Sequence, residues 1–292
     1  VEGITVLSLF DGISCGRVAL ERAGIEVKKY YASEIDKHAI KVTGDNWKET
    51  IQLGDVTKIS YKDGILHTEN GEFRVGKIDL LIGGSPCQSI SNLGNGLGLN
   101  GKSGLFYHWL RLKDEIKPEY WLLENVVGKK EAINEISNLL GTSPNMINSN
   151  LLSAQNRKRL YWCSVGKLTP PNLKNVNLKD ILEDGLPEDS KLTDSRKKWL
   201  LSESGQKCVN KKYATIDPIK ASCLTARSDS SWNSNYVYRG DELTRLTPIE
   251  YERLQTLPDN YTVCISAPNR YKSIGNAWTV DIISYIFNCM FN

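Results

Sequence analysis

The stretch "ITVLSLFDGISCGRVALERAG", residues 4–24, carries the strongest indication of the fold. Its first seven residues form an apolar run that predicts a buried strand. The segment "GRVALERAG" (16–24) then shows helical spacing, with Gly24 placed to end a helix. Gly12 and Gly16 allow a tight turn and a close approach of the backbone to a ligand. A strand, a glycine turn and a helix in this order are the unit from which parallel α/β sheets are built.

The same pattern recurs along the first half of the chain. Four further apolar runs predict strands: "VKKYYASEID" (27–36), "KIDLLIGG" (77–84), "YWLLENV" (120–126) and "RLYWCSVG" (159–166). Helix-like segments over 104–116 and 130–140 separate the later strands, and the final "VDIISYIFNCMF" (280–291) fits a buried helix. This order predicts a doubly wound, mostly parallel sheet.

The composition of the chain changes after Gly166. Residues 167–240 are rich in Lys, Asn, Ser, Asp and Pro without a sustained helical period, which indicates a separate small domain or a large insertion. Helical periodicity returns at "TPIEYERLQTLP" (247–258), where Thr247 can cap a helix with Glu250 three residues later.

Composition places the chain among ordinary soluble proteins. Of its 292 residues 40% are hydrophobic and 24% charged, and the net charge is +3. The seven cysteines follow no disulfide or metal-binding spacing, which favours a reducing compartment such as the cytoplasm and no metal. No membrane-spanning stretch or secretory leader is expected. Residues 191–227 hold nine Lys and Arg against three Asp and Glu, weak support for a nucleic-acid partner.

One cysteine follows an internal strand. In "LIGGSPCQSISN" (81–92) the apolar run ends at Gly83-Gly84, and Pro86 and Cys87 come next. The carboxyl edge of an open α/β sheet is where ligands bind. Cys87 is therefore a candidate nucleophile, the alternative being an inert core cysteine.

Two acidic residues are candidates for binding a nucleoside. The spacing of Gly12 and Gly16 is not that of a dinucleotide fingerprint, so a pyrophosphate site is poorly supported. Glu34, about twenty positions later, can accept hydrogen bonds from ribose hydroxyls, and Asp55 can accept one from an adenine amino group. The alternative is a tight turn without a ligand.

A glutamate and two arginines are further candidates. Glu124 in "LLENVVG" (122–128) is either a proton-sharing acid catalyst or a carboxylate satisfied by a neighbouring arginine. Arg157 and Arg159 in "SAQNRKRLYW" (153–162) are expected to point toward the same sheet edge, unless they pair with surface carboxylates.

The elements "SPCQ", "ENV" and "QNRKR" occur in this order, followed by "RLTPIEYERLQTLP" (245–258) and "SIGNAWTV" (273–280). Together they resemble the cytosine-C5 DNA methyltransferase family over almost the whole chain. The strings "VLSLFDGIS", "ASEID", "IGGSPC" and "SIGNAW" look closest to the de novo (DNMT3-like) branch, whereas the glutamine after Cys87 and "QNRKR" match the commoner bacterial pattern. The resemblance implies a prokaryotic or phage source.

The resemblance also implies the fold and the reaction. The fold is the S-adenosylmethionine-dependent methyltransferase fold, an α/β doubly wound Rossmann-like mixed sheet. Residues 1–166 and 245–292 would form the catalytic and cofactor-binding domain, and 167–244 a smaller target-recognition domain. The enzyme would flip a cytosine out of duplex DNA and methylate ring carbon 5 through a covalent cysteine adduct. The glycine-rich stretch 89–104 would be a mobile lid, the alternative being a disordered surface loop.

Roles of single residues follow from the resemblance. Cys87 is the nucleophile, Glu124 binds the base at ring nitrogen 3 and the amino group, Asn125 orients the Pro86–Cys87 segment, Arg159 binds the ring carbonyl and Arg157 supports the catalytic loop. The cofactor S-adenosylmethionine, which leaves as S-adenosylhomocysteine, would contact Phe10, Asp11, Gly12, Ile13, Cys15, Gly16, Glu34, Ile35, Asp55, Val56, Leu105, Asn276, Ala277 and Trp278. DNA would contact Gln88, Ser89, Lys211, Lys212, Thr225 and Arg227.

Duplex DNA is thus the expected partner, with a cognate restriction endonuclease as a second partner class and a monomer as the default state. Three alternatives stay open at this point. A sister branch methylates transfer RNA, and Cys223-Leu224-Thr225 matches part of its Cys-Phe-Thr element. The chain can also be a catalytically silent binding protein, although the nucleophile and the cofactor turn are intact. A nicotinamide-dependent oxidoreductase is the third alternative, and its glycine spacing is missing.

Overall fold

The computed structural model describes residues 3–86, 104–211, 213–228 and 234–292. The chain forms two compact units. Unit 1 comprises Val1–Ile147, Lys158–Pro170 and Ile282–Asn292, and unit 2 comprises Asn148–Arg157 and Pro171–Asp281. The expected recognition segment 167–244 falls within unit 2 apart from residues 167–170, and its function stays a prediction.

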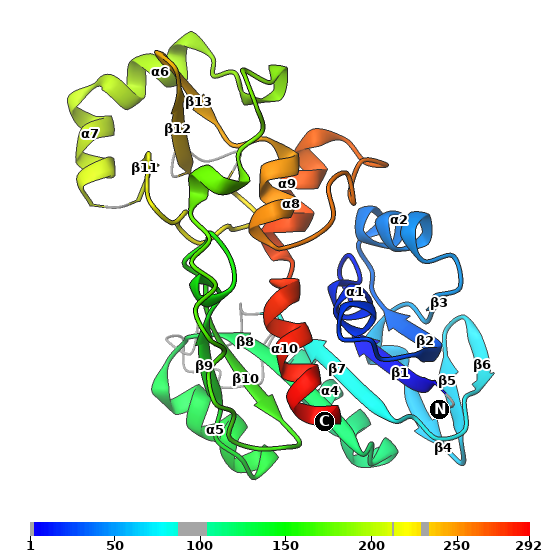
Figure 1. The fold of residues 1–292 in the computed structure, drawn as a ribbon. Coiled ribbons are helices and arrows are strands. Elements are labelled where there is room, and N and C mark those ends of the chain that lie inside the picture. The colour runs from blue at the N-terminus through cyan, green and yellow to red at the C-terminus, as the bar shows by residue number, and fades with distance from the viewer. Residues whose placement is uncertain (1–2, 87–103, 212, 229–233) are drawn as a thin grey trace. The chain divides into compact units, whose positions relative to one another are not determined.

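Unit 1 is built on a seven-stranded sheet in the order β3-β2-β1-β7-β8-β10-β9 (Figure 1). Its strands are β1 (Ile4–Leu9), β2 (Val27–Ser33), β3 (Ile51–Gln52), β7 (Leu80–Gly84), β8 (Tyr120–Val126), β9 (Asn145–Asn148) and β10 (Lys158–Cys163). Pairing is parallel from β3 through β8, and β10 runs antiparallel to β8. The predicted α/β mixed sheet is confirmed.

Helices cover both faces of this sheet (Figure 1). They are α1 (Cys15–Arg22), α2 (Lys37–Asn46), α4 (Gly104–Ile116), α5 (Lys130–Leu140) and α10 (Val280–Phe291). Trp109 of α4 and Ile136 of α5 share one core cluster with Leu81 and Leu123 of the sheet, and all four residues are fully buried. The bounds of β8, α4 and α5 are those that the apolar spacing predicts.

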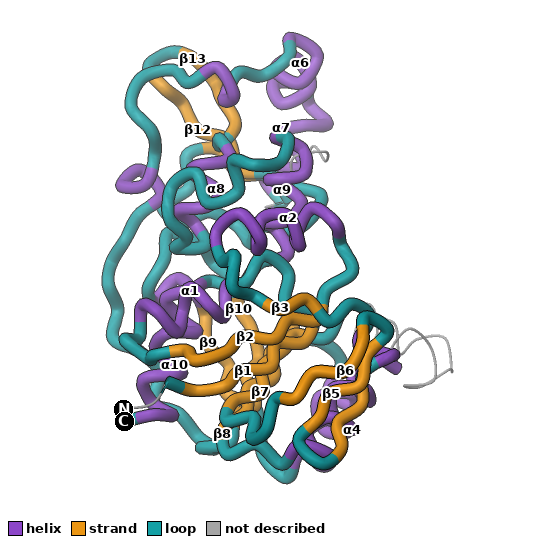
Figure 2. Tube along the Cα trace, turned by 90° about the vertical axis from the view of Figure 1, so that its right-hand side faces the viewer, coloured by secondary structure: helices purple, strands orange, loops and turns teal. Residues whose placement is uncertain are grey.

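A small antiparallel sheet of β4 (Ser60–Lys62), β5 (Ile65–Thr68) and β6 (Gly71–Arg74) was not predicted. It lies beside α4 (Figure 2), where Tyr61 N donates to Glu115 Oε2 at 2.8 Å. Its first turn is Asp63-Gly64, with φ of 51° and 77°. An Asp-Gly pair of this geometry is a hairpin signal, but strands of three or four residues are too short for a clear alternation.

Unit 2 holds the remaining elements, which are α6 (Asp194–Leu201), α7 (Glu203–Asn210), β11 (Thr215–Ile216), β12 (Asn235–Arg239), β13 (Glu242–Arg245), α8 (Pro248–Leu254) and α9 (Ala267–Asn276), with a short 3-10 turn at Leu178–Ile181. The expected cap of α8 is present, because Thr247 and Glu250 form a capping box. Two helices within 167–240, α6 and α7, were not predicted from the sequence. Helices α6 and α7 are only eight residues long, so neither shows a sustained apolar period.

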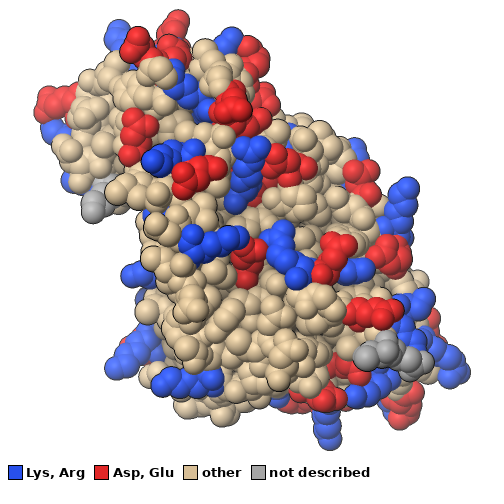
Figure 3. All heavy atoms as spheres, viewed as in Figure 1, with Lys and Arg blue, Asp and Glu red and all other residues tan. Residues whose placement is uncertain are grey.

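Within the described ranges, no helix combines the length and apolar character needed to cross a membrane. On the face seen in Figure 3, Lys and Arg are interspersed with Asp and Glu rather than gathered by sign. The weak net charge of +3 agrees with this mixture.

Candidate active site

The strand register brings four chain segments to one edge of the sheet. Leu9 of β1 pairs with Ser33 of β2 and with Gly83 of β7, and Gly84 pairs with Glu124 of β8. Because these strands are parallel, the residues that follow each of them emerge at the same edge. This is the edge at which open α/β sheets bind their ligands.

The segment that leads to the predicted nucleophile is fixed by two contacts. A Cβ on Gly83 would lie 2.8 Å from Leu9 O and from Trp109 Cδ1, so only glycine fits there. The Asn125 side chain is 1% exposed, and its Nδ2 donates to Ser85 O at 3.2 Å and to Ser85 Oγ at 3.0 Å. Cys87, Gln88, Ser89 and nearly all of the predicted lid, 89–104, lie outside the described residues.

Glu124 is held by an arginine from the neighbouring strand. Arg159 pairs with Val126 in the β8–β10 register, so its side chain lies on the same face as Glu124, and Arg159 Nε is 3.1 Å from Glu124 Oε1. Both side chains are largely buried, at 15% and 11% exposure. Of the two alternatives for Glu124, the structure shows the carboxylate that is paired with a neighbouring arginine.

Arg157 makes different contacts from Arg159. Its guanidinium is buried in unit 2 and donates to Leu224 O at 2.8 Å and to Ala277 O at 2.9 Å. Arg157 thus differs from Arg159 in its partners, which are backbone carbonyl groups and not a carboxylate. It directly precedes β10, which begins at Lys158, so it lies outside the alternation of that strand.

A buried polar network in unit 2 was missed by sequence reasoning. Gln155 Nε2 donates to Gln255 Oε1 at 3.1 Å, and Thr279 Oγ1 donates to the same oxygen at 2.8 Å. Gln255 Nε2 donates to Ala277 O at 3.1 Å, and Leu224 N donates to Gln155 Oε1 at 2.9 Å. The two glutamines therefore fix the backbone of two segments that also hold Arg157.

The glycine turn after β1 has an unusual backbone. Phe10, Gly12 and Ser14 have φ of 56°, 58° and 59°, so every second residue is left-handed. Glu34 ties this turn to β2, since Gly12 N donates to Glu34 Oε2 at 2.8 Å and Ile35 N donates to Glu34 Oε1 at 2.8 Å. The next side chain, Ile35, is 75% exposed. The turn is thus held in one strained conformation beside an exposed apolar surface.

Asp11 lies in this turn among hydroxyl groups. Tyr30 Oη donates to Asp11 Oδ1 at 2.8 Å, and Ser14 Oγ donates to Oδ2. Burial raises the pKa of Asp11 to about 6, against the opposing effect of hydrogen bonds from Ser14, Ser8 and Tyr30. Sequence reasoning missed Tyr30, because it reads as one more apolar residue of β2.

The other predicted cofactor residues have varied surroundings. Asp55 accepts a hydrogen bond from Thr57 N at 2.9 Å and so caps a 3-10 turn. Asn276 is exposed at the end of α9. Of the rest, Ile13, Cys15, Gly16, Val56 and Ala277 are buried, and Phe10, Leu105 and Trp278 are half-buried. Within the described ranges no three acidic, histidine or cysteine side chains gather as metal ligands.

The predicted DNA contacts that the structure describes belong to unit 2. Lys211, Thr225 and Arg227 are exposed, whereas Lys212 lies outside the described residues. Thr225 Oγ1 lies 3.1 Å from Ser228 Oγ and accepts a hydrogen bond from Arg227 N at 3.3 Å.

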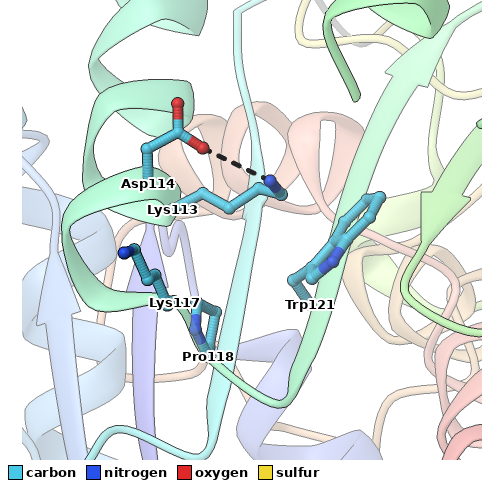
Figure 4. A pocket seen from close by; sticks show the side chains of 5 residues that line it. All are labelled: Lys113, Asp114, Lys117, Pro118 and Trp121. Atoms are coloured by element: carbon cyan, nitrogen blue, oxygen red, sulfur yellow. Dashed lines mark hydrogen bonds and ion pairs between the residues drawn. The ribbon is translucent and has the colours of Figure 1, made fainter. Parts of the chain in front are cut away.

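A surface pocket of about 330 Å³ lies at the amino end of β8, away from Glu124 at the carboxyl end (Figure 4). It is lined by Lys113, Asp114, Lys117, Pro118 and Trp121. Lys113 Nζ lies 3.4 Å from Asp114 Oδ1 and 5.4 Å from the centre of the Trp121 ring. No predicted site residue lines this pocket.

Comparison with known proteins decides the family. The sequence profile of the C-5 cytosine-specific DNA methylase family matches residues 4–240 and 198–292. The chain belongs to the C-5 cytosine-specific DNA methylase family. This membership confirms the predicted enzyme class, a methyltransferase that acts on carbon 5 of cytosine in DNA.

Individual relatives agree with this family. The type II methyltransferase M1.ScrFI of Lactococcus lactis subsp. cremoris is 29% identical over 312 residues, which cover 96% of this methylase and 76% of the relative. The orphan methyltransferase M.SPRI of Bacillus phage SPR is 32% identical over 199 residues, 62% of this chain and 43% of that protein. The structure of the Entamoeba histolytica methyltransferase EhMeth has the same fold, with a TM-score of 0.79 at 17% identity, covering 100% of this methylase and 98% of that chain.

Proposed function

We propose that this methylase uses S-adenosylmethionine as its methyl donor and Cys87 as the nucleophile that attacks a flipped cytosine. The observation that carries this proposal is the shared sheet edge. Asn125 holds Ser85, two residues before Cys87, and Glu124 precedes Asn125 on β8. The nucleophile segment and the predicted base-binding glutamate thus start from neighbouring strand ends.

The turn after β1 fits an S-adenosyl group. Such a group carries an aromatic adenine, ribose hydroxyls and an amino acid end with a positively charged α-ammonium group. Ile35 offers an exposed apolar surface, Glu34 and Asp55 offer acceptors, and Asp11 offers a carboxylate. A Cβ on Gly12 would meet nothing within 4 Å, so the backbone there is open to a ligand. When bound, S-adenosylmethionine supplies the methyl group.

By resemblance, we propose that the cofactor also contacts the other residues predicted from the sequence. These are Phe10, Ile13, Cys15, Gly16, Val56, Leu105, Asn276, Ala277 and Trp278.

The chemistry of the base follows from the proposed roles. The Cys87 thiolate forms a bond from Sγ to carbon 6, and the electron pair of the 5,6 double bond makes carbon 5 nucleophilic. Glu124 binds ring nitrogen 3 and the amino group, and Arg159 binds the ring carbonyl, where charge develops. After methylation, carbon 5 loses its proton, the double bond re-forms and the bond from Sγ to carbon 6 breaks.

We propose duplex DNA as the substrate and 167–244 as the recognition segment. Lys211, Lys212 and Arg227 would bind phosphates, while Thr225, Gln88 and Ser89 would lie near the flipped base and its neighbours. Arg157 would support the catalytic loop through the two backbone segments it holds. The de novo branch, a prokaryotic or phage source, a cytoplasmic location and a cognate endonuclease belong to the same proposal.

The test is methyl transfer from labelled S-adenosylmethionine to duplex DNA of mixed sequence, followed by base-resolution mapping. We expect label on cytosine carbon 5 with the intact protein and none with Cys87→Ser. Cys289→Ser, which changes an exposed thiol at the C-terminus, is the matched control and should keep full activity. Label on transfer RNA but not on DNA would overturn the DNA assignment, and an active Cys87→Ser would overturn the nucleophile.

A further inference from the structure

A chain of hydroxyl groups connects two secondary structure elements to the cofactor turn. Tyr30 Oη, from β2, donates to Asp11 Oδ1 at 2.8 Å. Ser14 Oγ donates to Asp11 Oδ2 and lies 2.9 Å from Thr43 Oγ1 of α2. Tyr30, Ser14 and Thr43 are at most 1% exposed, so the three hydroxyl groups are shielded from water and directed at one another and at Asp11.

The Asp11 carboxylate receives hydroxyl donors but no cation. Among the described residues, no lysine or arginine forms an ion pair with it. Arg17, the first of the two arginines of α1, pairs with Glu49 at 3.5 Å and lies over the Trp47 ring. The charged neighbour that Asp11 does have is Glu34, whose like charge opposes ionisation. A half-buried carboxylate in these surroundings lacks a positive charge.

We propose that Tyr30 is a positioning residue, which keeps Asp11 ionised and directed so that the carboxylate receives the α-ammonium group of the S-adenosyl ligand. This inference rests on the proposed function, because it takes the glycine turn to be the cofactor site. The Tyr30 hydroxyl stabilises the ionised form through a charge-assisted hydrogen bond. Ser14 does the same for the second oxygen and is itself held by Thr43.

The proposal makes ligand affinity depend on pH in a defined way. With a pKa of about 6, Asp11 is ionised above that pH and protonated below it, so affinity falls as the pH drops through this range. Removing the Tyr30 hydroxyl removes a donor to the ionised form and raises the pKa further. The pH at which affinity is halved then moves upward, by about one unit for one hydrogen bond to a charged group.

The adjacent tyrosine provides a matched control. Tyr31 points to the opposite face of β2, where its ring packs edge to face on Phe73 with centroids 6.4 Å apart. Tyr30→Phe and Tyr31→Phe therefore remove the same atom from neighbouring positions of one strand. Only the first of them changes the contacts of Asp11.

The experiment is calorimetric titration of S-adenosylhomocysteine into the intact protein and its variants between pH 5.5 and 8.5, with the melting temperature of each free variant as a check of folding. We expect Tyr30→Phe to bind about threefold more weakly near pH 6.5 and about eightfold more weakly at pH 5.5, and to approach the unaltered protein at pH 8.5. Asp11→Asn should bind weakly with no pH dependence in this range. Tyr31→Phe should give the unaltered pH profile.

Two results would overturn the inference. One is an equal loss of affinity at every pH in Tyr30→Phe, which indicates a merely structural role, and the other is a pH profile that survives in Asp11→Asn. If Tyr30→Phe does not fold, Ser14→Ala removes the other donor and must move the midpoint in the same direction. Failure of the unaltered protein to bind the ligand at any pH would instead reject the proposed cofactor itself.

Discussion

Arg159 Nε lies 3.1 Å from Glu124 Oε1 across the antiparallel pair β8–β10. Both side chains are largely buried, and the guanidinium compensates the carboxylate that would otherwise lie there without a partner. The two side chains that we assign to one cytosine ring thus already hold each other in position.

Loss of this arginine should be costly for folding. Arg159→Ala leaves Glu124 largely buried without its partner, and we expect a loss of about 3 kcal/mol in the free energy of unfolding. The double variant Arg159→Ala/Glu124→Gln should recover most of that loss, because the uncompensated charge is gone. Chemical denaturation of the single and double variants measures the coupling, and additive losses would contradict it.

Asn125→Ala should lower turnover without lowering cofactor affinity. The variant removes both hydrogen bonds to Ser85 and frees the start of the nucleophile segment, so we expect kcat to fall about tenfold or more. Asn145→Ala is the matched control, since Asn145 makes comparable bonds to Gly166 O and Leu168 N elsewhere in unit 1. Equal kcat in the two variants would argue against a role for Asn125 in catalysis.

Two helical glycines should respond in opposite directions to alanine. A Cβ on Gly275 would lie 2.2 Å from Thr225 O and 2.4 Å from Thr225 C, which are backbone atoms that cannot easily yield. Gly275→Ala is therefore expected to destabilise unit 2 by about 2 kcal/mol. Gly44 of α2 has nothing within 4 Å, so Gly44→Ala should stabilise the protein by about 0.5–1 kcal/mol. Thermal melts of both variants test this pair.

Asp11→Asn should stabilise the free protein, and only above acidic pH. The pKa of Asp11 is about 6 in the fold against a usual 3.8, so the folded state keeps a proton between these values that the unfolded chain has released. Stability from this group is present at low pH and is lost as the pH rises toward 6. We expect a gain of roughly 1–3 kcal/mol for Asp11→Asn at pH 7.5 and almost none at pH 4. The same gain at both values would show that Asp11 does not titrate in this window.

The sheet and its helices were largely predictable because their signals are local. An apolar run such as 120–126 or a capped helix such as that after Thr247 is encoded by neighbouring residues. The hairpin sheet of β4–β6 and the helices α6 and α7 were not, because each element is too short for its period to be seen. Tertiary packing decides such elements more than sequence pattern does.

The sequence predicted which residues belong to the candidate site where a motif contains them. It did not predict which of these residues contact one another. Glu124 was found from sequence, but its pairing with Arg159 and not Arg157 depends on where β10 begins. Tyr30 gave no signal, because alternation in β2 predicts a buried tyrosine equally well with or without a bond to Asp11. The Gln155–Gln255 contact joins residues 100 positions apart, beyond any local pattern.

The chain passes between unit 1 and unit 2 four times. Neither unit is therefore a continuous fragment that can be excised, expressed alone or exchanged at a single splice point. With 167–244 as the proposed recognition segment, a transplant of it into a related enzyme would need its junctions inside the stretch 171–244, leaving 148–157 and 245–281 with the recipient. The ten residues 148–157 would then decide whether a hybrid folds, because they hold their contacts to Leu224 only if the incoming segment presents the same backbone.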